Sequence, residues 1–86
     1  MPEISRFYGI IIRMFTREHR PPHFHVQYGA HKAVFTITPP ELTRGELPPR
    51  ARRLVVEWAN EHVADLLDDW ERSEQQVPLR PIAPLE

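Results

Sequence analysis

The stretch that decides the fold spans residues 23–36 and reads His23-Phe24-His25-Val26-Gln27-Tyr28-Gly29-Ala30-His31-Lys32-Ala33-Val34-Phe35-Thr36. Its first six residues alternate between apolar and polar side chains, which is typical of a half-buried strand. Gly29-Ala30 suits a two-residue type II′ turn, with glycine at the first central position. That turn pairs Val26 with Ala33 and Phe24 with Phe35, so the apolar side chains of both strands share one face. The sequence therefore predicts an antiparallel hairpin.

Two further segments extend this hairpin into a sheet. Residues 4–15 are rich in β-branched and aromatic side chains, and we interpret Gly9 in their middle as a bulge or a point of close approach. Pro39-Pro40 ends the second strand of the hairpin, because proline donates no ladder hydrogen bond. Residues 41–47 then add a short edge strand around Gly45. We expect three to four antiparallel strands in total.

The second half of the chain predicts a helix that bends or breaks. Pro48-Pro49 is a start signal, and no proline or glycine follows until Pro78. The strongest apolar row advances by four residues at each step and consists of Leu54, Trp58, His62, Leu66 and Trp70. A straight helix rotates by about 40° per such step, so the row would turn by about 160° around the axis. We therefore expect a break near residues 60–62, with Asn60 as a cap. Together with the sheet, a helix on one face gives an α+β fold.

The distribution of charge divides the chain. We expect one domain over residues 1–86, with a strand-rich part at 1–47, a helical part at 48–76 and an extended tail at 77–86. The first 53 residues hold nine basic and four acidic side chains, whereas the remainder holds two basic and eight acidic ones. All basic residues but one are arginines, whose planar fork suits phosphate and carboxylate groups. The division indicates an anion-facing first half, or two halves that neutralise each other.

Composition excludes several classes of protein. Hydrophobic residues make up 41% and charged residues 27% of the chain, which is typical of a globular protein rather than of a disordered tail. There are no cysteines, which excludes disulfides, thiolate metal sites and cysteine nucleophiles. No apolar run is longer than three residues. We therefore expect no signal peptide, no membrane contact and a cytoplasmic location.

His23 and His25 are the first candidates for chemistry. Two side chains at i and i+2 of a strand point the same way, so one phosphate or small ion can contact both imidazoles. In one interpretation they are the acid and base of phosphoryl transfer, with the phosphate held by Arg13, Arg20 or Arg17. In another they are surface histidines with structural hydrogen bonds. Both interpretations remain open at this point.

A third interpretation makes the same two histidines metal ligands. A catalytic zinc site needs three protein ligands, and the sequence offers three candidates for the third, namely His19, His31 and Glu18. Two ligands alone make a weak site that captures nickel or zinc adventitiously. We therefore expect no cofactor, no tightly held structural metal and none needed for folding.

The start of the helix carries a second candidate site. Arg50, Arg52 and Arg53 lie in the first turn, where the helix dipole already favours anions. A positive helix terminus with added arginines suits an anion-binding site. The alternative is a surface cluster that acids elsewhere in the fold neutralise.

Four short motifs of the chain belong together as a pattern. They are Phe7-Tyr8-Gly9-Ile10, Pro21-Pro22-His23-Phe24-His25-Val26, Leu47-Pro48 and Glu57-Trp58. Together they resemble a widespread family of small prokaryotic proteins of unknown function, in which Pro-Pro-His-Phe-His is the most specific part. Members are often encoded beside another small uncharacterised protein, in an arrangement similar to toxin–antitoxin pairs. The resemblance implies a partner protein and an activity directed at RNA or translation. It supplies no catalytic residues.

These observations favour a toxin-like protein that acts on RNA or nucleotides, without a metal, through His23, His25, Arg13 and Arg20. The alternative function is a non-catalytic adaptor or antitoxin-like module whose basic half binds nucleic acid or an acidic partner. The expected partners are the neighbour-encoded small protein, RNA, or a second copy of the chain.

Overall fold

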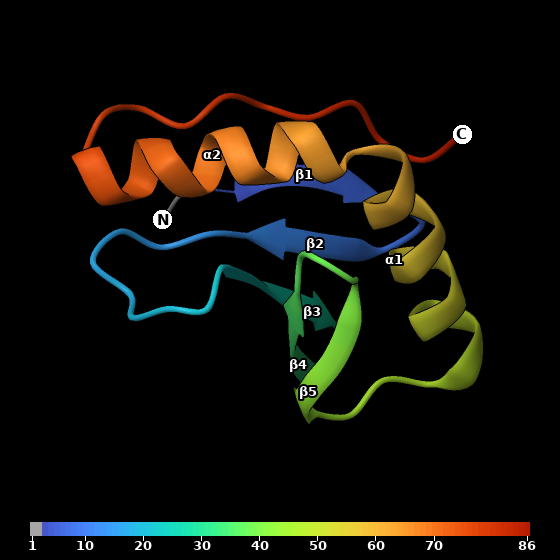
Figure 1. Cartoon of the computed structure of the whole chain (residues 1–86). Helices are drawn as coiled ribbons and strands as arrows, with labels where there is room; N and C mark the ends of the chain where they lie inside the picture. Colours follow the sequence, from blue (N-terminus) through green and yellow to red (C-terminus); the bar gives the residue numbers. More distant parts are fainter. Residues whose placement is uncertain (1–2) are drawn as a thin grey trace.

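The computed structural model describes residues 3–86, which form a five-stranded antiparallel sheet followed by two helices. The strands lie side by side in chain order and are β1 (Glu3–Phe7), β2 (Ile10–Arg13), β3 (His23–Tyr28), β4 (His31–Thr36) and β5 (Glu41–Gly45). Helices α1 (Pro49–Glu61) and α2 (Val63–Gln75) follow, and the tail runs back alongside α2 (Figure 1). The predicted α+β fold is confirmed, with five strands instead of three to four.

The central hairpin has the predicted register. β3 and β4 pair Phe24 with Phe35 and Val26 with Ala33, and all four side chains are buried. Gly29 adopts a φ of 59°, as the first central position of a type II′ turn requires. The alternation of apolar side chains and the type of turn thus both place the apolar side chains of β3 and β4 on the same inward face of the sheet.

The additional strand comes from residues 4–15, which form two strands rather than one. β1 and β2 pair Phe7 with Ile10 around a two-residue turn in which Tyr8 has a φ of 50° and Gly9 a φ of 80°. Positive φ at both central positions is characteristic of a type I′ turn. The interpretation of Gly9 as a bulge inside one strand was therefore wrong. A tyrosine seldom adopts this conformation, so the residue pattern did not indicate a turn.

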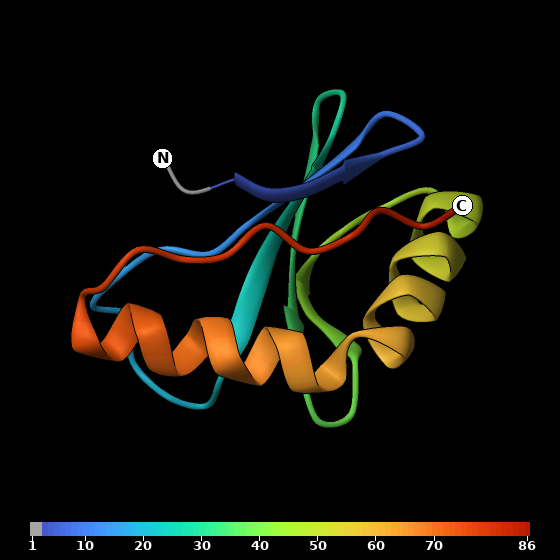
Figure 2. The ribbon, with the colours of Figure 1, turned by 90° about the horizontal axis from the view of Figure 1, so that it is seen from above.

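The helical part breaks where the drifting apolar row predicts. His62 is the single residue between the end of α1 and the start of α2, and the two helices form an L (Figure 2). The His62 N–H donates back to the Ala59 carbonyl at 3.1 Å, while its own carbonyl accepts from Leu66 N at 2.9 Å. Asn60 lies within α1 and is not the cap, so that expectation was wrong. Neither helix of the described part has the length and apolar character to cross a bilayer.

Trp58 joins the helices to the sheet. Its fully buried ring lies 5.3 Å from the Phe7 ring and 6.0 Å from the Phe24 ring, measured between centroids. Its Nε1–H donates to the Ala83 carbonyl at 2.8 Å, which ties the tail to α1. The helices thus cover one face of the sheet (Figure 2). We call the opposite side, which carries His25, the outer face.

Two hydrogen bonds hold the tail beside α2 and β1. Ile82 N–H donates to the Ile4 carbonyl at 2.7 Å, and Arg80 N–H donates to Asp69 Oδ1 at 2.8 Å. Burial raises the pKa of the Asp69 carboxyl, and the hydrogen bond from Arg80 offsets part of that rise. The tail therefore completes the core, in which Ile82 and Leu85 are buried.

A substitution of Gly45, at the end of β5, tests how closely β5 packs against β4. A Cβ atom there would collide with the Lys32 carbonyl and lie 2.9 Å from Ala33 Cα, at a φ of 83°. We expect Gly45→Ala to lower the free energy of unfolding by more than the roughly 1–2 kcal/mol of a left-handed conformation alone. Gly29→Ala is the matched control, since its Cβ would meet no atom within 4 Å. Urea denaturation measures both, and equal losses would contradict the collision.

Candidate functional site

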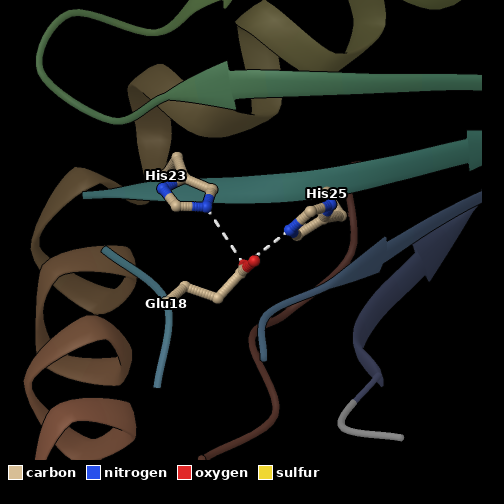
Figure 3. A group of neighbouring side chains, drawn as sticks. All are labelled: Glu18, His23 and His25. Carbon is tan, nitrogen blue, oxygen red and sulfur yellow. Dashed lines mark hydrogen bonds and ion pairs between the residues drawn. The ribbon is translucent and has the colours of Figure 1, made fainter. Parts of the chain in front are cut away.

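Glu18 lies between the two histidines of β3. The Nε2 atoms of His23 and His25 are 3.0 and 2.6 Å from the same carboxylate oxygen, Glu18 Oε1. Figure 3 shows the carboxylate reaching from its loop toward both rings. The arrangement follows from strand geometry, because alternate residues of β3 project to the same side. We call these three residues the Glu–His cluster.

The loop that carries Glu18 is fixed to the end of α2. Arg17, with a φ of 65°, donates from Nη2 to Gln76 Oε1 at 3.2 Å. Arg20 pairs with Glu74, with Nη2 3.1 Å from Oε1. These contacts hold the loop backbone on both sides of Glu18 next to α2.

Each imidazole is also held by an aromatic neighbour. His23, with 11% of its side chain exposed, lies 5.1 Å from the Trp70 ring of α2. Its Nδ1 atom is 2.8 Å from the Pro21 carbonyl oxygen. His25 packs edge-on against Phe15 at 4.7 Å and keeps 30% of its side chain exposed. His23 is therefore largely covered by α2, whereas His25 is partly exposed to solvent.

The carboxyl of Glu18 is held in its charged form. Burial alone would raise its pKa, but the hydrogen bond from His25 and the charges of His25 and His23 outweigh burial. The pKa of Glu18 therefore lies below its ordinary value of 4.5. Its carboxylate remains an acceptor for both rings at neutral pH.

Two adjoining hollows open beside the Glu–His cluster on the outer face. One, of about 270 Å³, contains the cluster itself together with His19 and Arg20. The other, of about 420 Å³, runs over the middle strands. His25, Val34 and Arg44 line both hollows. The cluster is therefore continuous with a longer surface over the sheet.

That longer surface is positively charged. Arg13, Lys32 and Arg44 line the larger hollow, and within residues 3–86 none of them takes part in an ion pair. Arg13 instead donates to Gln27 Oε1 at 2.6 Å. Glu18 is the one acidic residue in the described lining of either hollow. We call Arg13, Lys32 and Arg44 together the cation face.

The arginines that the sequence offered as phosphate contacts have different surroundings in the structure. Arg13 stands opposite His25 in the pairing of β2 with β3. Arg20 lies beside the cluster, but its guanidinium pairs with Glu74, so one of the predicted phosphate contacts is already engaged. Arg44 was missed. It stands opposite Val34 in the pairing of β4 with β5, which the register of an edge strand could have indicated.

The arginines of the first helical turn lie elsewhere. Arg52 and Arg53 line a separate hollow with Val56 and Glu57, and Arg50 is exposed at the start of α1. None of the three borders the Glu–His cluster. Any anion site there is independent of the histidines.

A metal ion would find three ligands in the Glu–His cluster. Glu18, His23 and His25 each offer one ligand atom, and these atoms all lie within 4.8 Å of one another. Of the three residues that the sequence left as candidates for the third ligand, Glu18 is the one that joins the histidines. His19 approaches only as far as a 6.2 Å ring separation from His23, and His31 is exposed in the next strand.

Residues 9–71 match the family described as domain of unknown function DUF4160. The chain belongs to this family. The matched segment includes the Glu–His cluster and the cation face, and it reaches into α2. The expected membership of a family of unknown function is thus confirmed. No curated protein and no solved structure matches the chain.

The charge of Glu18 predicts a pH-dependent contribution to stability. In metal-free protein with chelator present, Glu18→Gln should lower the free energy of unfolding by about 1 kcal/mol at pH 7, because charge-assisted hydrogen bonds are lost. A lowered pKa stabilises the folded state above the unfolded value, so the difference should shrink as pH falls below 4.5.

Urea denaturation at pH 5 and at pH 3 measures this difference across the range in which it should change. Glu41→Gln, at an exposed carboxylate of β5, is the matched control and should change little. A deficit of Glu18→Gln at pH 3 as large as that at pH 5 would contradict the charged form.

Proposed function

We propose that the protein is the toxin-like member of a two-protein module and that it binds and cleaves RNA on the outer face of its sheet. The observation that carries this proposal is the continuity of the two hollows, since His25 and Arg44 border both. A chain of phosphates lying along the cation face would therefore pass directly over the Glu–His cluster.

The charge of the outer face supports an RNA ligand. Arg13, Lys32 and Arg44 are free of ion pairs within the described residues, so phosphates need not displace internal partners. Arginine binds phosphate through two parallel N–H donors, and the release of counterions from the nucleic acid adds to affinity. The face thus supplies binding that is independent of base sequence.

The Glu–His cluster supports cleavage. In RNA cleavage the 2′-hydroxyl loses its proton to a base and attacks the phosphorus, the P–O5′ bond breaks, and the leaving 5′-oxygen takes a proton from an acid, while a positive charge stabilises the phosphorane. In this proposal His25 and His23 are the base and acid, Glu18 orients both rings, and Arg44 supplies the positive charge. His25 is partly exposed at the junction of the hollows, where a phosphate can reach it.

A non-catalytic adaptor is the second candidate function. The ion pair of Arg20 with Glu74 favours it, because one cation beside the Glu–His cluster already has an acidic partner. An adaptor would use the cation face alone. It would bind RNA without turnover, whichever member of the module it is.

Growth after induced expression tests the cleavage. We expect the wild-type chain to arrest growth and to fragment cellular RNA, and co-expression of the neighbour-encoded protein to relieve the arrest. His25→Ala should abolish fragmentation, because it removes the more accessible of the two imidazoles in the cluster. His31→Ala is the matched control and should remain toxic, since His31 lies outside both hollows. Normal growth with intact RNA in the wild-type strain would exclude the toxin.

Salt dependence tests the cation face separately from chemistry. Three phosphate contacts on single-stranded RNA predict a slope of log K against log salt of about −2, and Arg44→Ala should reduce its magnitude by about 0.7. Fluorescence anisotropy with a labelled RNA oligonucleotide in chelator measures both slopes. Arg53→Ala, on the separate hollow of α1, should leave the slope unchanged. Equal slopes for wild type and Arg44→Ala would remove the cation face from the proposal, and binding without cleavage would favour the adaptor.

A further inference from the structure

We propose that Glu18, His23 and His25 bind a divalent first-row transition-metal ion, for which Zn²⁺ is the test ion. This inference goes beyond the RNA activity, because it rests on the donor atoms alone. The sequence assured only two ligands and so predicted no tightly held metal. The structure brings Glu18 to the same point as the third, with all ligand atoms within 4.8 Å of one another.

The hydrogen-bond partners of His23 call for a cation at this point. Its Nδ1 atom lies 2.8 Å from the Pro21 carbonyl oxygen, which can only accept, so Nδ1 carries the hydrogen. In a neutral ring the Nε2 atom then presents a lone pair. That lone pair faces the Glu18 carboxylate, a second acceptor, at 3.0 Å. Two acceptors at this distance need a shared proton or a metal ion between them.

The orientation of His23 is the one that metal ligands adopt. Ligating histidines almost always donate their second ring N–H to a backbone carbonyl or a carboxylate, which fixes the tautomer and directs the free nitrogen at the metal. The Pro21 carbonyl provides this contact, and the Trp70 ring at 5.1 Å limits rotation of the imidazole.

The cluster can accept an ion with a small adjustment. Metal–ligand bonds of about 2.0–2.1 Å in a tetrahedral site place the ligand atoms about 3.4 Å apart. The two distances to Glu18 Oε1, 3.0 and 2.6 Å, would have to widen by about 0.4 and about 0.8 Å. Glu18 lies on a loop with 26% of its side chain exposed, so it can move outward without disturbing the core.

The donor set selects the type of ion. Two imidazoles and one carboxylate suit zinc and its first-row neighbours, whereas Mg²⁺ and Ca²⁺ prefer oxygen ligands alone. Three protein ligands leave a fourth position for water, which would face the hollow of about 270 Å³. The site therefore has the composition of a reactive metal centre rather than of a closed structural one.

Metal titration of the untagged, full-length chain tests the site. After dialysis against chelator, isothermal titration with ZnCl₂ should show about one ion per chain, and Co²⁺ should develop visible absorption bands of a low-coordinate centre. Mg²⁺ should not compete. We expect Glu18→Ala and His25→Ala to weaken Zn²⁺ binding by at least about 10- to 100-fold, the loss that removal of a mere supporting contact already causes.

Two controls keep the outcome decisive. His31→Ala should bind Zn²⁺ like the wild type, and circular dichroism should show that each variant is folded. The inference is overturned if the wild type binds no Zn²⁺, if Glu18→Ala and His25→Ala both retain wild-type affinity, or if His31→Ala loses binding equally. RNA binding is measured in chelator, so loss of the RNA activity with Zn²⁺ binding intact contradicts only the proposed function.

Discussion

The position of Trp58 is the constraint on which the rest of the fold depends. Its ring contacts β1 through Phe7 and β3 through Phe24, and its indole N–H binds the tail at Ala83. One side chain thus joins the sheet, α1 and the last residues of the chain. In a domain of 86 residues, which buries a modest share of its surface, few other contacts can connect all the layers. The same ring lies 5.5 Å from the His62 ring, so it also contacts the junction from which α2 leaves.

Local rules account for the parts of the fold that were predicted. The alternation around Val26 and the glycine turn fix the register of β3 against β4, and the drift of the apolar row requires the break at His62. The turn between β1 and β2 could not be predicted in the same way. Tyr8 adopts a conformation that its own side chain disfavours, and the surrounding hairpin imposes it. Asn60 failed as a cap because helix geometry, rather than a capping side chain, sets the junction.

In the candidate site too, the parts set by local sequence were predictable and the parts set by contacts between distant residues were not. Strand periodicity places His23 and His25 on one side of β3, and this requires no tertiary information. The choice of Glu18 over His19 or His31 depends on a loop whose path is fixed by contacts with Gln76 and Glu74, more than fifty residues away. Pairings of such separation leave no signal in local sequence. The ion pair of Arg20 with Glu74 is another contact between distant parts of the chain, so the local sequence did not indicate it either.

The contact between the tail and β1 has a consequence for association. β1 is an edge strand of the sheet, and exposed backbone groups of edge strands recruit strands from other molecules. The Ile82 N–H occupies the Ile4 carbonyl on that border, and the prolines around it cannot extend a ladder. The tail therefore prevents a further strand from pairing with β1. A chain cut before residue 78 would present an open border and would lose Ile82 and Leu85 from the core, so it would tend toward strand-exchanged dimers or aggregates.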